Sequence, residues 1–453
     1  MCPATYFNAM MSTFVCNPGY RIVSYSEAQV LKEVREDAQL RGIQKTVNWD
    51  AKGTFGAAYV IPKQKDLGRF RPICPSFKEP MVRTARMMSK ALKPMVRTAR
   101  MMSKALKPMV RTARMMSKAL NFLLYNLPKS WHFNLRAVSD LTAQIERINS
   151  RLSKLPGERE VNSYSFDIKE MFCKLPHDVI LQAVDWIIDH HMSKGHESVR
   201  VNTRGKGAAF GVTTGSDHWK RLNLEEVKSF VQLEIEHTYF CGTGVLLRQV
   251  VGVPMGKSMS PPIACIMCAY SEYQLTCTLG QACRFFGALR LIDDVLLIIS
   301  SRDERTRALI FEALSNCHPE GLVLKRTDDG SGTLEFLGCQ IRTRQTYPYV
   351  GCMQLSQNDD SIWTQDKLLI QNDQSFHSWG SKKHKSAVIG SLLHRINQNT
   401  SIRSEIPGRV LGLQQELVKK DFPVKFVNRV FHRFGSRRDG LWRRTIEFVC
   451  DKQ

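Results

Sequence analysis

The feature that constrains this chain most is a pair of aspartates inside an apolar run. Residues 290–300 read RLIDDVLLIIS, so Asp293 and Asp294 interrupt a stretch whose other members from Leu291 to Ile299 are all apolar. Such a run is typical of a buried strand, where an unpaired charge is too costly to bury. The simplest arrangement is a β-hairpin with both carboxylates at its turn. Because Asp is also an ordinary turn residue, the pair alone does not identify a site.

Two other segments carry features that belong with this pair. Residues 163–176 read SYSFDIKEMFCKLP, and their alternating apolar residues indicate a strand with Asp167 near its end. Residues 248–264 read RQVVGVPMGKSMSPPIA and predict a strand, then a Gly/Pro loop, then an apolar helix. Taken separately, each segment also fits an ordinary strand end or loop.

Together, the three segments predict a site for nucleotidyl transfer. In that reaction a 3′-hydroxyl attacks an α-phosphate in line with the leaving pyrophosphate, assisted by two Mg²⁺ ions about 3.5–4 Å apart. Mg²⁺ prefers carboxylate oxygens that have little steric freedom. One aspartate on a strand and a pair on a neighbouring hairpin can supply them, while the Gly/Pro loop can line the nucleotide and template pocket.

The same motifs, in the same order, resemble those of reverse transcriptases. SFDIKEMF resembles the first palm motif, GVPMGKSMSPPIA the Gly-x-Pro loop motif, LIDD the catalytic hairpin motif, TLEFLGCQI the palm–thumb hairpin and IPKQKDLGRFRPI the fingers motif. This resemblance covers residues 54–345. Tyr239–Phe240, RQVVGVPMG and QSFHSWGSKKHKSAVIGSLLHR are similar to Penelope-like retroelements and extend it to about residue 430. It implies an α+β polymerase right hand with fingers, a palm of antiparallel sheet and helices, and a thumb.

The resemblance also implies a role for individual residues. Asp167 and Asp294 would bind the metals, and Asp293 would support or bind the same ions. Phe172 would stack under the sugar and exclude a 2′-hydroxyl. The remaining residues implied by the motifs are Lys63 and Arg71 on the triphosphate, Gly252, Pro254, Met255 and Gly256 beside the nascent base pair, and Phe336, Leu337 and Gly338 on the primer strand.

Some positions depart from the family pattern. Leu291 stands where the hairpin motif usually has Tyr or Phe, and Lys257 and Met259 alter the usual character of the loop. The position of Leu291 packs beside the primer and holds no metal. Up to Gln453 no segment resembles the GIY-YIG nuclease that most Penelope-like proteins carry.

The expected organisation follows the right hand. We expect an N-terminal extension over residues 1–50, with Ser26 and Gln29 as a capping box, and fingers over 51–135. The palm with the aspartates would span 136–320. The palm–thumb hairpin and a basic helical thumb would span 321–453.

The charge of the chain points to a polyanionic partner. The sequence has 65 Lys+Arg against 42 Asp+Glu, a formal net charge of +23, and such an excess is typical of proteins that bind nucleic acid. We expect the partners to be an RNA template, a DNA primer and dNTPs. The expected cofactor is Mg²⁺, as two ions, with Mn²⁺ as a substitute.

A 14-residue repeat precedes the palm. PMVRTARMMSKALK occurs at 80–93 and 94–107, and a third copy at 108–121 ends in Asn121. The copies contain 11 Lys+Arg and no acidic residue, and a proline opens each one, which predicts three short, kinked helices. Either this region is a basic surface for nucleic acid, or it is a recent duplication tolerated in an exposed region, with one copy as the original element.

Other clusters favour no separate site. Cys265 and Cys268 lie in an apolar run without a second ligand pair, so they are interpreted as core residues. His377 and His384 are expected on a basic thumb surface. The sequence shows no apolar run of the roughly 20 residues that span a bilayer, and we expect no membrane partner.

Two alternatives to an RNA-directed DNA polymerase remain. One is a catalytically retired, maturase-like protein that only binds RNA. The other is an RNA-dependent RNA polymerase, against which Phe172 and the FLG segment argue. A nuclear location follows from the retroelement resemblance, and an organelle-encoded mitochondrial enzyme is the alternative.

Overall fold

The computed structural model places the chain in two compact units, which are described separately. It describes residues 2–47, 49, 53–63, 66–75, 109–157, 160–211, 218–356, 358, 362, 364–365, 368 and 375–451. The first unit comprises Met1–Phe133, Ile168–Thr278 and Ala313–Val323, and the second comprises Asn134–Asp167, Leu279–Glu312 and Leu324–Gln453. The chain therefore passes back and forth between them.

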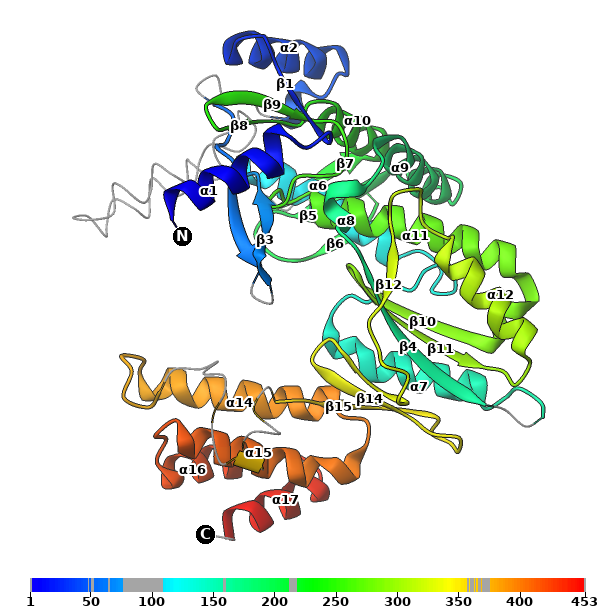
Figure 1. Cartoon of the computed structure of the whole chain (residues 1–453), viewed down its shortest axis with the longest axis vertical. Coiled ribbons are helices and arrows are strands. Elements are labelled where there is room, and N and C mark those ends of the chain that lie inside the picture. Colours follow the sequence, from blue (N-terminus) through cyan, green and yellow to red (C-terminus); the bar gives the residue numbers. More distant parts are fainter. Residues whose placement is uncertain are drawn as a thin grey trace. The chain divides into compact units, whose positions relative to one another are not determined.

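The first unit combines helices with small antiparallel sheets (Figure 1). The sheets have the orders β1–β9–β8, β2–β3 and β6–β5–β7. The elements are α1 (Pro3–Met10), the π-helix Met11–Val15, β1 (Tyr20–Ile22), α2 (Glu27–Leu40), α3 (Gln44–Val47), β2 (Tyr59–Lys63), β3 (Asp66–Ile73), α6 (Met109–Tyr125), α8 (Met171–Lys174), α9 (His177–Met192), β5 (Ser198–Asn202), β6 (Ala208–Phe210), β7 (Trp219–Asn223), α10 (Leu224–Glu236), β8 (Tyr239–Gly242), β9 (Val245–Gln249) and α11 (Ser260–Leu279).

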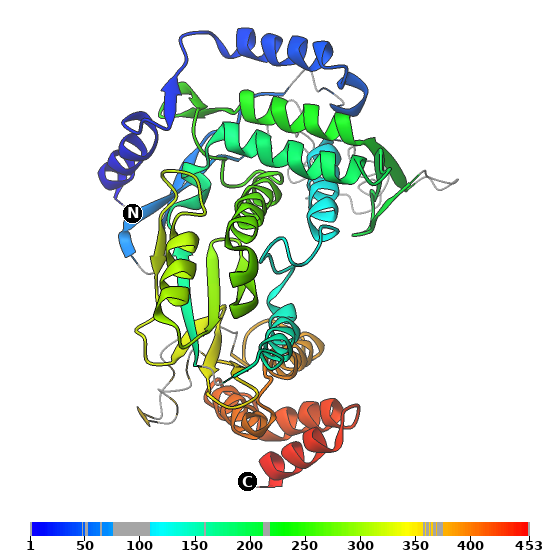
Figure 2. The same ribbon diagram turned by 90° about the vertical axis from the view of Figure 1, so that its right-hand side faces the viewer.

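Local signals in the sequence set several of these boundaries. Helix α2 begins at the predicted capping box, in which the Ser26 side chain accepts from the Gln29 N–H and the Gln29 side chain accepts from the Ser26 N–H. Asn223 and Glu226 form the same arrangement at α10. Helices α9 and α10 pack side by side (Figure 2).

The third repeat copy does not form a short surface helix. It opens α6, which continues without interruption to Tyr125, four residues beyond the repeat. Met115, Met116, Ala119 and Leu120 are buried, so this copy contributes a core helix, and the prediction of a short, kinked helix is wrong for it. Its burial agrees with the alternative in which one copy is the original element. The copies at 80–93 and 94–107 lie outside the described residues.

The second unit is built around a sheet in the order β10–β11–β4–β12 and a smaller sheet in the order β13–β14–β15. Its elements are the 3-10 turn Val138–Asp140, α7 (Leu141–Leu152), β4 (Val161–Ile168), the 3-10 helix Gly280–Phe285, β10 (Phe286–Leu291), β11 (Asp294–Ser300), α12 (Glu304–Ser315), β12 (Leu324–Arg326), β13 (Thr333–Phe336), β14 (Cys339–Thr343), β15 (Val350–Gln354), α14 (Lys382–Asn399), the 3-10 turn Arg403–Glu405, α15 (Ile406–Lys419), α16 (Val424–Gly435) and α17 (Gly440–Asp451).

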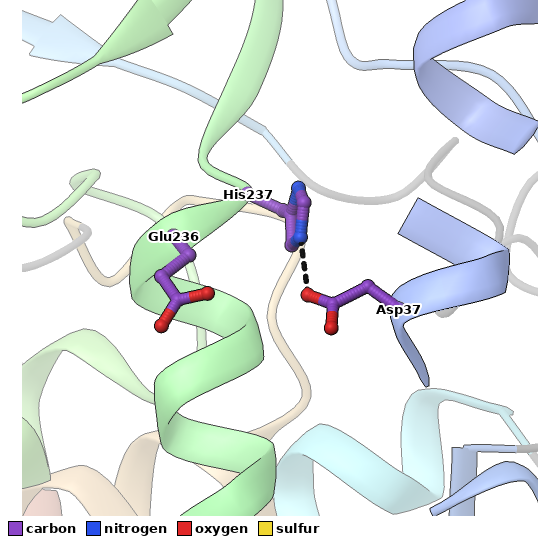
Figure 3. Close-up of side chains that lie close together, drawn as sticks. All are labelled: Asp37, Glu236 and His237. Carbon is purple, nitrogen blue, oxygen red and sulfur yellow. Dashed lines mark hydrogen bonds and ion pairs between the residues drawn. The ribbon is translucent and has the colours of Figure 1, made fainter. Parts of the chain in front are cut away.

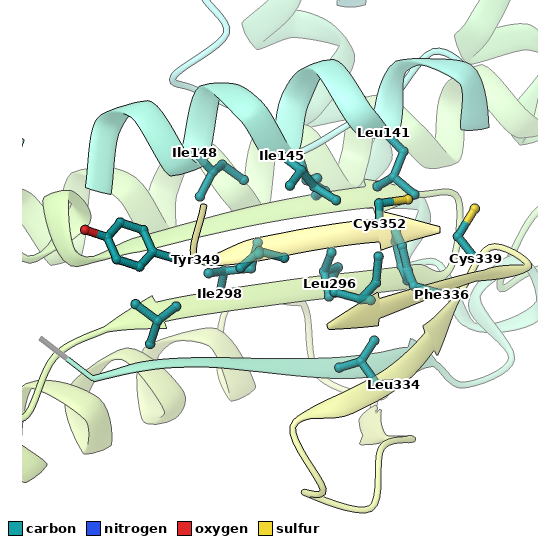
Figure 4. Packing of buried hydrophobic residues seen from close by; sticks show 14 of the residues in the cluster. Leu141, Ile145, Ile148, Leu296, Ile298, Leu334, Phe336, Cys339, Tyr349 and Cys352 are labelled. Carbon is teal, nitrogen blue, oxygen red and sulfur yellow. The ribbon is translucent and has the colours of Figure 1, made fainter. Parts of the chain in front are cut away.

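Helix α7 covers one face of these sheets (Figure 4). Leu141, Ile145 and Ile148 pack against Leu296 and Ile298 of β11, and each such side chain contributes about 1.5–3 kcal/mol when fully buried. Helix α7 also approaches β10 closely, because a Cβ at Gly287 would lie 2.9 Å from the Ile148 side chain.

The C-terminal helices form a core of their own. Trp442, Phe431 and Leu393 are buried among α14, α15, α16 and α17, while the predicted thumb histidines, His377 and His384, are exposed. Within the described part of the chain, no helix combines the length and apolar character that crossing a membrane requires.

Candidate active site

The predicted catalytic aspartates meet on neighbouring strands of one sheet. Strands β4 and β11 pair antiparallel, and in their register Asp167 lies directly opposite Asp294. Residues directly opposite in an antiparallel pair point to the same face of the sheet. The expected hairpin is also present, since β10 and β11 pair up to Leu291 and Asp294.

The hairpin turn is strained at one residue. Ile292 and Asp293 form the two-residue connection, and Ile292 has a φ of 60°. A positive φ at the first turn residue is the geometry of a type II′ turn, which glycine normally fills. A β-branched residue in this region stores backbone strain, and such strain concentrates at functional sites.

A buried arginine supports this turn. Arg290 has 0% of its surface exposed, and its Nη1 donates to the carbonyl oxygen of Ile292 at 3.1 Å. Its own carbonyl accepts from the Leu135 N–H at 2.7 Å. The guanidinium therefore ties the turn to its own strand.

The donor set fits a hard divalent cation. Asp294 is exposed, and Asp167 and Asp293 are partly exposed, so carboxylate oxygens are accessible at the end of a rigid sheet, as Mg²⁺ requires. The three aspartates do not bring three oxygens within 4.8 Å of one another, since among the described residues only Asp37, Glu236 and His237 form such a group. Three like charges repel in the absence of a cation.

The strand that carries Asp167 is anchored by a second network. The Asp328 carboxylate, with 2% of its side chain exposed, accepts from the Ser165 N–H at 2.9 Å and pairs with Arg326 at 2.7 Å. The Thr327 N–H donates to the Ser165 carbonyl at 2.8 Å. Burial alone would raise the pKa of Asp328, but the hydrogen bonds from Arg326 and Ser165 outweigh it and lower that pKa. Asp328 is therefore held as a carboxylate that fixes β12 to β4.

The predicted nucleotide loop lies in the first unit and is held by its backbone. The Gly252 N–H donates to the Leu175 carbonyl at 2.8 Å, and the Val253 N–H donates to the Phe172 carbonyl at 2.7 Å. Gly252 has a φ of 80°, and a Cβ there would lie 2.5 Å from the Phe172 carbonyl oxygen. Both the dihedral angle and the close approach therefore require glycine.

The same loop contacts the fingers hairpin. The Cys74 N–H donates to the Met255 carbonyl at 3.0 Å, and Gly256 has a φ of 111° beside Cys74. Pro254 accepts a hydrogen bond from the Ser260 hydroxyl at 2.7 Å, which joins the loop to α11. The structure thus brings Phe172, the loop and the end of β3 together.

The two fingers cations occupy different places on the predicted hairpin. Arg71 pairs with Ile61 across β2 and β3 and is exposed. Lys63 lies at the end of β2, and its ammonium interacts electrostatically with the thiol of Cys173, the residue after Phe172. The pKa of the Cys173 thiol is raised to about 11, first by its burial and then by the negative charge of Glu170, while the positive charge of Lys63 lowers it. Lys63 is therefore on the Phe172 side of the hairpin.

The departures in the loop motif have a structural reason. Lys257 is buried and its Nζ lies 3.4 Å from Oε2 of Glu234, which is also buried. Met259 is buried as well. The Lys257–Glu234 pair therefore joins the loop to α10.

The palm–thumb hairpin is present, with one difference from the motif-based assignment. Leu337 and Gly338 have φ of 55° and 72° and connect Phe336 to Cys339, which is a type I′ turn. Phe336 is 3% exposed and packs in the core with α7. The turn residues Leu337 and Gly338 are therefore the accessible part of this element, and the Phe336 ring supports them. Leu291 also packs against that core.

The group formed by Asp37, Glu236 and His237 joins α2 to α10 (Figure 3). His237 Nε2 lies 2.6 Å from Asp37 Oδ2, Arg41 Nε lies 2.8 Å from Asp37 Oδ1, and Arg41 also pairs with Glu236. The guanidinium already occupies both carboxylates, so a metal ion would have to displace it. We interpret the group as a structural ion-pair network.

Sequence reasoning missed three residues of the site. Asp328 and Glu234 act through contacts that no local pattern reveals, whereas Arg290 left one signal in the sequence. An arginine directly before the apolar residues of the LIDD motif was a usable signal, because a charge within a buried strand needs a partner.

Comparisons with known proteins support the fold. No family model matches this sequence, and no curated protein matches it by sequence. Among solved structures, telomerase from Candida albicans in complex with the TWJ fragment of telomeric RNA has a TM-score of 0.52 at 16% identity, covering 87% of this chain and 63% of that one. Apo telomerase from Candida tropicalis has a TM-score of 0.51 at 14% identity, covering 96% and 73%. The chain thus spans less than two thirds of the first telomerase. The predicted α+β polymerase right-hand fold is confirmed.

Proposed function

We propose that this chain is an RNA-directed DNA polymerase that extends a DNA 3′ end along an RNA template. The observation that carries the proposal is the register of β4 and β11, which sets Asp167 opposite Asp294 beside a strained hairpin turn. Strand-borne carboxylates on one face are what two-metal nucleotidyl transfer requires. The protein would bind an RNA template, a DNA primer and dNTPs.

The aspartates and Arg290 would have different roles in the reaction. Asp167 and Asp294, with Asp293, would hold two Mg²⁺ ions, which supply activation of the primer 3′-hydroxyl and stabilisation of the pyrophosphate. Arg290 would keep the turn rigid so that the carboxylates need no reorganisation. The new bond forms between the 3′-oxygen and the α-phosphorus as the bond to pyrophosphate breaks.

The Gly/Pro loop of the first unit would select the nucleotide. The backbone of Gly252, Val253 and Met255 sets the position of Phe172 and of the β3 end. Phe172, partly exposed, would pack under the sugar and reject a 2′-hydroxyl. Lys63 and Arg71 would bind the triphosphate, Arg71 through a bidentate contact.

Primer extension on an RNA template tests this proposal. Wild-type protein should extend a DNA primer with dNTPs in Mg²⁺, with little product from rNTPs, and Phe172→Ala should raise ribonucleotide use. Product with rNTPs in preference to dNTPs would favour an RNA polymerase instead. No product from folded protein that binds RNA tightly would favour a retired, RNA-binding protein.

We also propose that the chain derives from a Penelope-like retroelement and acts in the nucleus. The motif RQVVGVPMG, Tyr239–Phe240 and the segment at 374–395 support the origin. A tagged protein imaged with nuclear and mitochondrial markers tests the location, and mitochondrial signal alone would contradict it.

A further inference from the structure

The small sheet β6–β5–β7 has one face that the proposed polymerase chemistry does not use. In its register Arg200 lies opposite Arg221, and Asn202 lies opposite Trp219. These residues share the face opposite to that of Val199 and Leu222, which are buried. The sheet is therefore amphipathic, with an arginine pair and an indole ring on its outer side.

The arrangement of cations on this face costs stability by itself. Like charges directly opposite one another in a sheet repel. The Arg221 Nε donates to the Ser198 hydroxyl at 3.0 Å, and the Arg204 Nη1 lies 2.6 Å from His218 Nε2. Arg200 contacts the Trp219 ring, with its guanidinium carbon 5.4 Å from the ring centroid. A hydroxyl, an imidazole and an indole thus orient these guanidinium groups.

The face is also held rigid from behind. Lys118 of α6 donates from Nζ to the carbonyls of Asn202 and Gly205 at 2.8 and 2.7 Å. The Asn202 side chain accepts from the Arg204 and Gly205 N–H groups. Trp219 rests on Gly207, where a Cβ would come within 3.0 Å of the ring. The turn that carries Arg204 is thus preorganised, which lowers the entropy cost of binding.

The charge of the segment agrees with a polyanionic ligand. Residues 198–223 contain five Lys+Arg and one acidic residue, Asp217, which lies outside the described residues. Arg204, Lys206, Lys220 and Arg221 are exposed, and Trp219 is partly exposed. Cations beside an aromatic ring are the components with which proteins bind unpaired strands, because phosphates pair with the cations and bases stack on the ring.

We propose that the outer face of β6–β5–β7 is a second nucleic-acid site, which binds single-stranded RNA. Phosphates pair with Arg204 and Arg221, and an unpaired base stacks on the Arg200–Trp219 pair. A duplex satisfies the first contact but not the second, because its bases are not free to stack on a side chain. This binding does not require polymerase activity.

The test measures binding of a fluorescein-labelled 12-nucleotide single-stranded RNA by anisotropy at several salt concentrations. Excess unlabelled RNA–DNA hybrid is present throughout to occupy any duplex site. The double variant Arg204→Ala/Arg221→Ala should bind at least about tenfold more weakly, and its slope of log K against log salt should be shallower by about 1.4, or about 0.7 for each lost phosphate contact. Arg204→Lys/Arg221→Lys keeps the charge and should keep the slope.

Trp219→Leu separates stacking from charge. Loss of one stacked base should weaken binding of the single strand between about 5- and 150-fold with an unchanged salt slope. Binding of a 12-base-pair RNA duplex should not change. The matched control is Lys32→Ala/Arg35→Ala, which removes two exposed charges from α2 and should leave both affinities as in the wild type.

Two results would overturn the proposal. One is that Arg204→Ala/Arg221→Ala, folded as judged by its melting temperature, binds single-stranded RNA like the Lys32/Arg35 control. The other is that 4-thiouridine RNA crosslinks only to peptides outside residues 198–223. A failure of primer extension would leave this test unaffected, so the two proposals fail independently.

Discussion

The two regions that carry predicted site residues, one in each unit, are held in different ways. The carboxylate part in the second unit presents side chains from strands, and its backbone is held by the register of β4, β10 and β11. The loop part in the first unit presents its backbone, held by hydrogen bonds at Gly252 and Val253 and by two glycines with positive φ. Substitutions in the first part should therefore change chemistry, and those in the second should change stability first.

The largest expected effect is on chemistry. Asp294→Asn removes a charge from the proposed metal site at an exposed position, so primer extension should fall at least about 10³-fold, equivalent to about 4 kcal/mol. Unfolding free energy should change by less than about 0.5 kcal/mol. The exposed Asp329→Asn is the control, and it should extend primers normally. A large loss of stability in Asp294→Asn would contradict the contrast between the two parts.

The buried pair beside the loop should produce the largest stability effect. Glu234→Leu leaves the Lys257 ammonium buried without that carboxylate and should cost about 3–5 kcal/mol. The double variant Glu234→Leu/Lys257→Met replaces both charges and should recover most of that loss. Urea unfolding of Glu234→Leu, Lys257→Met and the double variant measures the coupling free energy between the two side chains. A double variant as unstable as the sum of the singles would exclude an ion pair.

Gly252→Ala should destabilise the loop part by about 2–3 kcal/mol, because strain at positive φ adds to the contact with Phe172. Gly244→Ala is the matched control, since Gly244 has a φ of 85° with open space around it. Its cost should be only about 1 kcal/mol. Equal costs in thermal unfolding would mean that the approach to Phe172 does not matter.

Asp328 should make the carboxylate part sensitive to acid. Its folded pKa is lower than its unfolded value, so its contribution is fully present above about pH 4, the unfolded pKa, and is lost as pH falls through the folded value. At pH 7, Asp328→Asn should cost about 1–3 kcal/mol. Urea unfolding between pH 3 and 7 should show a smaller acid-induced loss in the variant than in the wild type.

The smallest expected effect lies at the hairpin turn. Ile292→Gly removes the strain of a β-branched residue at positive φ and should stabilise the protein by up to about 1 kcal/mol. Primer extension should nevertheless decrease, because a flexible turn holds Asp293 and Asp294 less firmly. Melting temperature and extension rate, measured on the same preparation, test whether stability and activity move in opposite directions. A parallel increase in both would remove any functional role for the strain.

The sequence by itself determined those elements whose residue pattern is typical of one type of local structure, such as the alternation of a strand or the residues of a turn or cap. The aspartate hairpin, the strand ending near Asp167 and the capping box at Ser26 follow from local alternation and turn chemistry, and all three are present. For the hairpin and the capping box, local patterns suffice because the hydrogen-bond partners are close along the chain. For the strand, alternation predicts the element but not its partner.

Only the tertiary structure decided the rest. It placed Phe336 in the core, paired Lys257 with Glu234 and buried Met115, Met116, Ala119 and Leu120 of the third repeat copy. It also set Asp167 opposite Asp294, although these residues are 127 positions apart in the sequence. Burial and pairing depend on which distant segments supply the opposing surface, and no local pattern in one segment contains that information.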